Sequence, residues 1–231
     1  MNIEQLNVVI LAFSRPDTFK QVLEACERSI PFVKVVMDFP TNEEIKLKQQ
    51  KIESILHNSD IDYLIRKRQE NFGLVRSVLT TISEELEHNE HIILLEDDCV
   101  PSQEFFEFVA SSLEQHKENK KISSICGTIT GCRFNPWGWA TWNHKWNYES
   151  FTKEQIQEID NLQPELLHFL SCNDVEDSIW SLNWLASQYK NDTSSVFPKT
   201  NLITNVGLND TGVHSIEKGY TKWLVSQIQN Q

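Results

Sequence analysis

Three consecutive carboxylates, Glu96, Asp97 and Asp98, follow directly on the short apolar run 92–95. Like charges this close repel one another, so a chain that places them at the end of a buried strand either solvates a turn or holds a cation. A strand-end loop of this kind can bind Mn²⁺ or Mg²⁺ through one or two carboxylates and leave the other positions to water and phosphate oxygens. The alternative is that the acids cap the following helix and complement its dipole.

Polar residues also follow two other predicted strands. Ser14 and Arg15 come directly after the apolar run 7–13, and Asp38 lies near the end of the run 32–40. An acid at the end of a second strand suits a ribose or base contact, and a helix cap explains it about equally well. For Arg15 the alternative is an ordinary surface arginine.

The predicted helix 71–89 opens on a short segment that contains Asn71 and Gly73. Gly73 permits close approach of a ligand to the backbone, and Asn71 can hydrogen-bond a base or a phosphate. A turn that caps the helix explains both residues nearly as well. Arg68 and Arg76 are possible phosphate partners.

Four tryptophans, with a glycine between the first two, fall within a dozen residues: Trp137, Trp139, Trp142 and Trp146. Gly138 is unusual for a helix interior, so we expect an irregular segment whose aromatic faces, that of Trp139 among them, stack against the apolar face of a sugar. Burial in the core is the alternative.

Candidate catalytic acids lie far along the chain, at Asp174, Glu176 and Asp177. A base that faces an acceptor across a bound donor has to come from such a distant segment. A solvated first turn of a helix is the alternative. His214, in an irregular C-terminal stretch, is either structural or a ligand for a transition metal.

These residues are positioned by an alternation of strands and helices through the first half of the chain. Strands are predicted at 7–13, 32–40, 62–67, 91–95 and 122–131, and helices at 17–29, 41–58, 71–89 and 101–119. Further helices at 151–172 and 174–192, a strand at 194–198 and irregular chain at 199–215 complete the pattern. The alternation predicts an α/β fold, a mostly parallel sheet with helices on both faces. Because ligands bind beyond the carboxyl ends of such strands, the strand-end residues should converge on one edge.

Composition limits the possible partners. A formal net charge of −12 argues against non-specific binding to nucleic acid or to an anionic membrane. No apolar run approaches the ~20 residues of a membrane span, so we expect a cytoplasmic protein whose cysteines are reduced and mostly buried. At 231 residues the chain suits one domain, 1–231.

The stretch "IILLEDDCVPSQEFFEF" resembles the metal motif of nucleotide-sugar glycosyltransferases of the GT-A fold, most closely the N-acetylglucosaminyltransferase I and family-2-like lineage. Strand, acidic triplet, proline and aromatic residues all agree with that lineage. The resemblance implies a nucleotide-sugar-binding half, 1–110, and an acceptor-side half, 111–231. It also implies an inverting enzyme that uses a UDP-sugar or another nucleotide-sugar with Mn²⁺ or Mg²⁺. The acceptor would be a glycan, lipid-linked or polysaccharide hydroxyl, and peripheral membrane association is compatible with this.

The same resemblance implies roles for particular residues. Ser14, Arg15 and the backbone at Phe13 would contact the nucleotide, Asp38 the uracil or ribose, and Asn71 and Gly73 the base or diphosphate. Asp98 would ligate the metal, while Glu96 and Asp97 would hold ribose and sugar hydroxyls. Asp177 would be the general base, with Glu176 as its neighbouring alternative, and His214 a further metal ligand.

Two alternatives stay open at the level of sequence. A nucleotidyltransferase also binds a nucleotide and Mg²⁺ at strand ends, but the loop "AFSRPDTF" lacks the glycines typical of that class. A catalytically silent nucleotide-sugar-binding module would keep the fold and lack the base.

Overall fold

The computed structural model describes residues 1–129, 133–159 and 180–207. Its centre is a sheet in the order β3-β2-β1-β4-β7-β6-β8, and a separate two-stranded ribbon joins β5 and β9. The strands of the sheet are β1 (Val8–Ala12), β2 (Phe32–Met37), β3 (Asp62–Lys67), β4 (His91–Glu96), β6 (Ile122–Cys126), β7 (Trp139–Trp142) and β8 (Ser194–Val196). Strands β3, β2, β1 and β4 are mutually parallel, and β7 runs antiparallel between β4 and β6. The predicted α/β fold with a mostly parallel sheet is confirmed.

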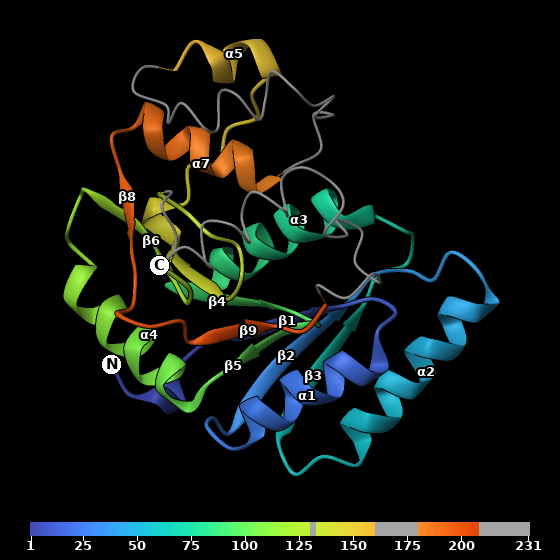
Figure 1. Cartoon of the computed structure of the whole chain (residues 1–231). Helices are drawn as coiled ribbons and strands as arrows, with labels where there is room; N and C mark the ends of the chain where they lie inside the picture. Colours follow the sequence, from blue (N-terminus) through green and yellow to red (C-terminus); the bar gives the residue numbers. More distant parts are fainter. Residues whose placement is uncertain (130–132, 160–179, 208–231) are drawn as a thin grey trace.

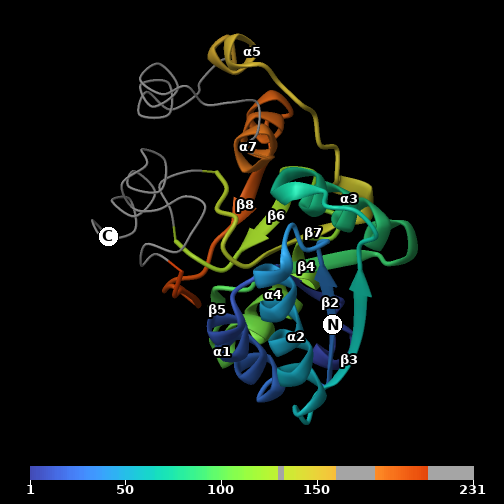
Figure 2. The ribbon, with the colours of Figure 1, turned by 90° about the vertical axis from the view of Figure 1, so that its right-hand side faces the viewer.

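Helices cover both faces of this sheet (Figure 1). They are α1 (Pro16–Glu27), α2 (Glu43–His57), α3 (Gly73–His88), α4 (Gln103–His116), α5 (Lys153–Gln157) and α7 (Trp180–Lys190), with single 3₁₀ turns at η1 (Ile3–Gln5) and η2 (Asn143–Lys145). Among the helices in these three stretches, none is both long and apolar enough to cross a membrane. Figure 2 views the structure after a rotation of 90° about the vertical axis and shows α1 and α2 on the opposite side of the sheet from α3 and α7.

Successive side chains of the central strands point to opposite faces of the sheet and form two hydrophobic cores. Val8 and Ile10 of β1 point to the core beneath α1, α2 and α4, whereas Val9 and Leu11 point to the core beneath α3 and α7. Strands buried on both faces read as continuous apolar runs because every position needs an apolar side chain. This is why residues 7–13 and 91–95 were recognisable as strands.

Two short strands, β5 (Cys99–Pro101) and β9 (Ile203–Asn205), were not predicted. They pair antiparallel, with Val100 opposite Thr204, and so bring the chain after β9 back against the acidic segment. The backbone N–H of Val206 donates to the carbonyl of Asp98 over 2.9 Å, which fixes the end of this ribbon beside the acids.

The predicted helices and strands of the second half differ from the structure in extent. The helix predicted at 151–172 is described only as the short α5, and the residues from 160 to 179 lie outside the described residues. The helix predicted at 174–192 is described from Trp180 onward as α7. The strand predicted at 194–198 is confirmed as β8.

The cysteines in the described part of the chain are buried. Cys26, Cys99 and Cys126 are free thiols, and burial raises the pKa of the Cys26 thiol well above its ordinary value and that of Cys126 to about 12. A thiol in such surroundings stays protonated and unreactive. Cys132 and Cys172 lie outside the described residues.

Candidate functional site

The carboxyl ends of β1, β2 and β4 lie at the same edge of the sheet. Leu11 pairs with Glu96 across β1 and β4, and Ala12 pairs with Met37 across β1 and β2. The residue that follows each strand therefore emerges at one place, as expected for the ligand-binding edge of a parallel sheet.

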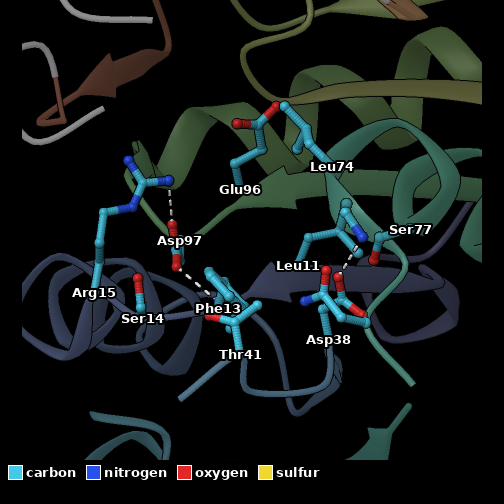
Figure 3. A pocket seen from close by; sticks show the side chains of 13 residues that line it. Leu11, Phe13, Ser14, Arg15, Asp38, Thr41, Leu74, Ser77, Glu96 and Asp97 are labelled. Atoms are coloured by element: carbon cyan, nitrogen blue, oxygen red, sulfur yellow. Dashed lines mark hydrogen bonds and ion pairs between the residues drawn. The ribbon is translucent and has the colours of Figure 1, made fainter. Parts of the chain in front are cut away.

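A cavity of about 340 Å³ opens at this edge (Figure 3). Such a volume lies within the range of small-molecule sites. The cavity is lined by the predicted strand-end residues together with several apolar ones: Leu11, Ala12, Phe13, Ser14, Arg15, Asp38, Thr41, Asn71, Gly73, Leu74, Ser77, Glu96 and Asp97. The prediction that the strand-end residues converge is confirmed, although Asp98, which pairs with Arg15, is not part of this lining.

Arg15 makes ion pairs with two of the three acids. Its Nη2 lies 2.5 Å from Oδ1 of Asp97, and its Nη1 donates to Oδ2 of Asp98. The other oxygen of Asp97 accepts the backbone N–H of Phe13 over 3.1 Å. Both carboxylates are nearly buried, with 2% of Asp97 and 5% of Asp98 exposed. Arg15, held where α1 begins, therefore supplies the positive charge that these two buried acids need.

The third acid has different surroundings. Glu96 is partly exposed in the cavity, and Figure 3 shows its side chain extending to the opposite side from that of Asp97. Burial of the carboxyl and the neighbouring charge of Asp98 raise the pKa of Glu96 to about 8. Burial also raises the pKa of Asp97 to about 6, against the opposing effect of Arg15. Glu96 therefore keeps its proton to a higher pH than an ordinary glutamate, and in the protonated form it can donate a hydrogen bond.

The Asp38 carboxylate is engaged by backbone donors. Its Oδ1 accepts the N–H groups of Phe39 and Phe72 at 2.9 and 2.8 Å, and its Oδ2 accepts that of Gly73 at 2.8 Å. Asn71 donates from Nδ2 to the carbonyl of Phe39 over 2.7 Å. Asp38 and Asn71 thus join the end of β2 to the start of α3, and Asp38 caps that helix while it lines the cavity.

Apolar residues form the wall between β1 and α3. Leu11 lies on the sheet, and Leu74 and Ser77 come from the first turns of α3. Five lining residues were not predicted from the sequence: Leu11, Ala12, Thr41, Leu74 and Ser77. The one available signal was spacing: Ser77 follows Gly73 by four residues, so both lie on the same face of the helix.

Trp139 does not present its ring to the cavity, and this corrects the expectation of sugar stacking. The residue begins a strand, β7, rather than lying in a loop, and is 1% exposed. Its ring stacks on Trp180 at 5.6 Å and meets Phe134 edge-on at 4.9 Å. All four residues of β7 are buried, with Trp139 in the core beneath α3 and α7 and Trp142 in the core beneath α1, α2 and α4, so both rings fill the core instead.

Two further candidates lie away from the cavity lining. Arg68 pairs with Glu84 at 2.7 Å, and Arg76 pairs with Glu70 at 2.8 Å while its guanidinium lies 3.7 Å from the centre of the Phe72 ring. Their charges are thus used within the protein. The remaining candidates, Asp174, Glu176, Asp177 and His214, lie outside the described residues.

The acidic segment does not fit a divalent cation in the arrangement seen here. Within residues 1–129, 133–159 and 180–207, no three His, Cys, Asp or Glu side chains are grouped to hold a metal ion. One oxygen of Asp97 and one of Asp98 face the Arg15 guanidinium. A cation at this position would therefore have to displace Arg15 or lie beside it.

Sequence comparisons found no match: no protein-family model and no curated protein corresponds to this chain. Comparison of structures did find likenesses. The chain superposes on a mannosyltransferase from Pyrobaculum calidifontis, solved in complex with GDP-Man and Mn²⁺, with a TM-score of 0.54 and 11% identity. The match covers 96% of this chain and 62% of the mannosyltransferase, so this chain spans less than two thirds of that protein.

A more distant likeness is to 4-diphosphocytidyl-2C-methyl-D-erythritol synthase from Anaerococcus prevotii, with a TM-score of 0.46, 13% identity, and coverage of 88% of this chain and 92% of that one. At these identities the likeness to the mannosyltransferase shows the fold alone. The chain has a GT-A-type α/β fold.

Proposed function

We propose that this protein is a glycosyltransferase that binds a nucleotide-sugar in the cavity at the ends of β1, β2 and β4. The observation that carries the proposal is the combination, in one cavity, of an apolar wall, a guanidinium and three strand-end acids. An apolar wall suits a base, a guanidinium suits a diphosphate, and acids suit sugar hydroxyls. The GT-A-type fold, shared with a mannosyltransferase solved with GDP-Man and Mn²⁺, supports it.

The cavity residues divide by chemistry along its length. Leu11 and Leu74 would pack against the base, and Arg15 would meet the phosphates. Glu96, which can donate as well as accept, would hydrogen-bond ribose or sugar hydroxyls. Asp38 would reach the base or ribose through the one lone pair of Oδ2 that its backbone partners leave free.

The backbone at Phe13 and the side chains of Ser14 and Asn71 border the same space and would complete the nucleotide contacts. All the lining residues fall between positions 11 and 97. We therefore assign nucleotide-sugar binding to residues 1–110 and acceptor binding to residues 111–231.

For the transfer itself we propose inversion at the anomeric carbon. An acceptor hydroxyl would attack that carbon as the bond to the diphosphate oxygen breaks, and Asp177 or its neighbour Glu176 would take the hydroxyl proton. A glycan, a lipid-linked sugar or a polysaccharide would supply the hydroxyl. A divalent cation at Asp98, with His214 as a further ligand, would stabilise the departing diphosphate when bound.

The donor nucleotide is the first point to test. The full chain is incubated with a panel of UDP- and GDP-sugars and Mn²⁺, and released UDP or GDP is measured. A glycosyltransferase releases the nucleoside diphosphate when it transfers the sugar to an acceptor, or more slowly when water takes the place of the acceptor. The variants Asp177→Ala and Glu176→Ala should identify the base by a fall in turnover of about 10²–10⁴-fold in one of them. Asp60→Ala, an exposed acid before β3, is the matched control.

The same assay separates the competing functions. Binding of a nucleotide-sugar with no release of nucleotide, even with acceptors present, would indicate a catalytically silent module. Release of pyrophosphate from a nucleoside triphosphate and a sugar phosphate would indicate a nucleotidyltransferase. Either result would contradict the proposed sugar transfer.

A further inference from the structure

Arg15 occupies the position at which a metal-dependent enzyme would need a cation. Its two terminal nitrogens contact Oδ1 of Asp97 and Oδ2 of Asp98, so one guanidinium bridges both carboxylates. Apart from that ion pair, Oδ1 of Asp97 is fully buried and has no hydrogen-bond partner in the described structure. Removal of Arg15 would therefore leave a buried carboxylate oxygen without a partner, and another cation could satisfy it.

The contact is enclosed by backbone from the far end of the described chain. A Cβ atom on Gly207 would lie 2.1 Å from Oδ2 of Asp98 and 2.9 Å from Nη1 of Arg15. The ribbon between β5 and β9 delivers Gly207 to this place. The ion pair is thus a packed feature and leaves little room for a second cation beside the guanidinium.

Charge balance decides what can bind. Two carboxylates and one guanidinium leave a single net negative charge, which is too little to hold a divalent cation strongly against the repulsion of Arg15. Conversely, a diphosphate near Arg15 would be repelled by the acids unless their charge were met by another cation. A divalent cation and a diphosphate bound together leave the net charge of the site unchanged, because the two charges of the cation offset those of the diphosphate, and each ligand then has an oppositely charged neighbour.

We propose that Arg15 keeps divalent cations off Asp97 and Asp98 in the free protein, and that a nucleoside diphosphate releases this block by drawing the guanidinium onto its phosphates. The proposal rests on the proposed function, because it takes the diphosphate of a nucleotide-sugar as the anion. Its consequence is thermodynamic coupling: the metal raises the affinity for the nucleotide, and the nucleotide raises that for the metal by the same factor.

Manganese binding tests the block directly and does not depend on turnover. Free Mn²⁺ is titrated by its electron paramagnetic resonance signal in the presence of the wild-type chain, Arg15→Gln and Arg28→Gln. Arg28 is exposed at the opposite end of α1, so its substitution makes the same change in charge away from the acids. We expect Arg15→Gln to bind Mn²⁺ at least about tenfold more tightly than the wild type, and Arg28→Gln to match the wild type.

A double variant, Arg15→Gln with Asp98→Asn, should lose the gained affinity and so place the ion at the acids. Equal Mn²⁺ affinity in the wild type and Arg15→Gln would overturn the proposal. If Arg15→Gln does not fold, the wild type alone decides: the relaxation rate of water protons reports protein-bound Mn²⁺ with and without UDP or GDP. A relaxation rate that rises only when UDP or GDP is present supports the block by Arg15. An equal rise in the relaxation rate without nucleotide overturns it.

Failure of the proposed function has a different signature. If neither UDP nor GDP binds the wild-type chain in Mn²⁺, by equilibrium dialysis of the nucleotide, the nucleotide-sugar assignment fails, and with it the release of Arg15 by a diphosphate. If a nucleotide binds while free wild-type protein already holds Mn²⁺ tightly, only the role of Arg15 is wrong.

Discussion

Oδ2 of Asp38 accepts the backbone N–H of Gly73 over 2.8 Å, which ties the end of β2 to the first residue of α3. The same carboxylate holds the N–H of Phe72, so two donors at the start of the helix depend on one side chain. Leu74 and Ser77 line the cavity from this helix. Asp38 therefore shapes the proposed nucleotide site even where it does not touch the ligand.

Replacement of Asp38 should weaken both folding and binding. Asp38→Ala removes the acceptor of three partly buried backbone donors, and we expect a loss of roughly 1.5–3 kcal/mol in the free energy of unfolding by urea. Asp38→Asn keeps one acceptor oxygen and should lose less. Equal stability of Asp38→Ala and the wild type would show that these donors find other partners.

Trp139 should matter for stability and not for ligand contact. Trp139→Ala is expected to lower the free energy of unfolding by roughly 3–5 kcal/mol, as for other large-to-small core changes. Trp139→Phe should lose less, because the buried indole Nε1 has no hydrogen-bond partner among the described residues and its removal breaks no hydrogen bond there. The affinity of Trp139→Phe for the nucleotide, measured by calorimetry, should equal that of the wild type. A tenfold weaker affinity would indicate that the Trp139 ring does contact the ligand.

His91 makes stability depend on pH. Burial lowers the pKa of His91 below its ordinary 6.5, with Glu90 opposing and Lys117 adding to the effect. Its Nε2 accepts the backbone N–H of Asn7 over 3.3 Å, a contact that needs the neutral ring. As pH falls below 6.5, the unfolded chain takes up a proton that the folded chain does not, so stability falls by up to about 1.4 kcal/mol per pH unit.

Urea unfolding at about pH 7.5 and about pH 5.5 checks this sign. The wild type should lose more stability between the two conditions than His91→Gln, whose side chain does not titrate. Because the carboxylates titrate alike in both chains, the difference between them isolates His91. The same pH dependence in both would contradict the account.

Two glycines near the cavity should respond to alanine for different reasons. Gly207→Ala places Cβ against Asp98 and Arg15, and we expect it to displace that ion pair, lower the free energy of unfolding by about 1–3 kcal/mol and change Mn²⁺ binding.

Gly73 has open space around it but a φ of +69°, so Gly73→Ala should lower the free energy of unfolding by about 1–2 kcal/mol through backbone strain, with Mn²⁺ binding unchanged. A change in Mn²⁺ binding by Gly73→Ala alone would contradict the assignment.

The four parallel strands of the central sheet were predictable because they carry their own signal, whereas β7 was expected as an irregular segment. The runs at β1, β2 and β4 are apolar on both faces, and β3 matches its predicted range 62–67. The ribbon of β5 and β9 was missed because strands of three residues have no measurable periodicity, and their pairing joins positions about a hundred residues apart.

The site was predictable in its location and less so in its contacts. Strand order alone placed Arg15, Asp38 and Glu96 at one edge. Sequence could not show that Arg15 bridges Asp97 and Asp98, nor that backbone groups occupy Asp38, because both depend on distances between separate elements. Trp139 was misjudged because a tryptophan-rich segment with a glycine has the same composition in a loop and in a core strand.

The most direct test of the central claim is calorimetric binding of UDP and GDP, with Mn²⁺, to the wild type and to a variant with the cavity filled. Ser77→Phe projects a ring from α3 into the cavity, and Ser83→Phe on the exposed side of the same helix is its control. We predict that one of the nucleotides binds the wild type and Ser83→Phe equally, and Ser77→Phe at least about tenfold more weakly, about 1.4 kcal/mol. Binding of neither nucleotide, or equal binding by folded Ser77→Phe, would contradict a nucleotide-sugar site in this cavity.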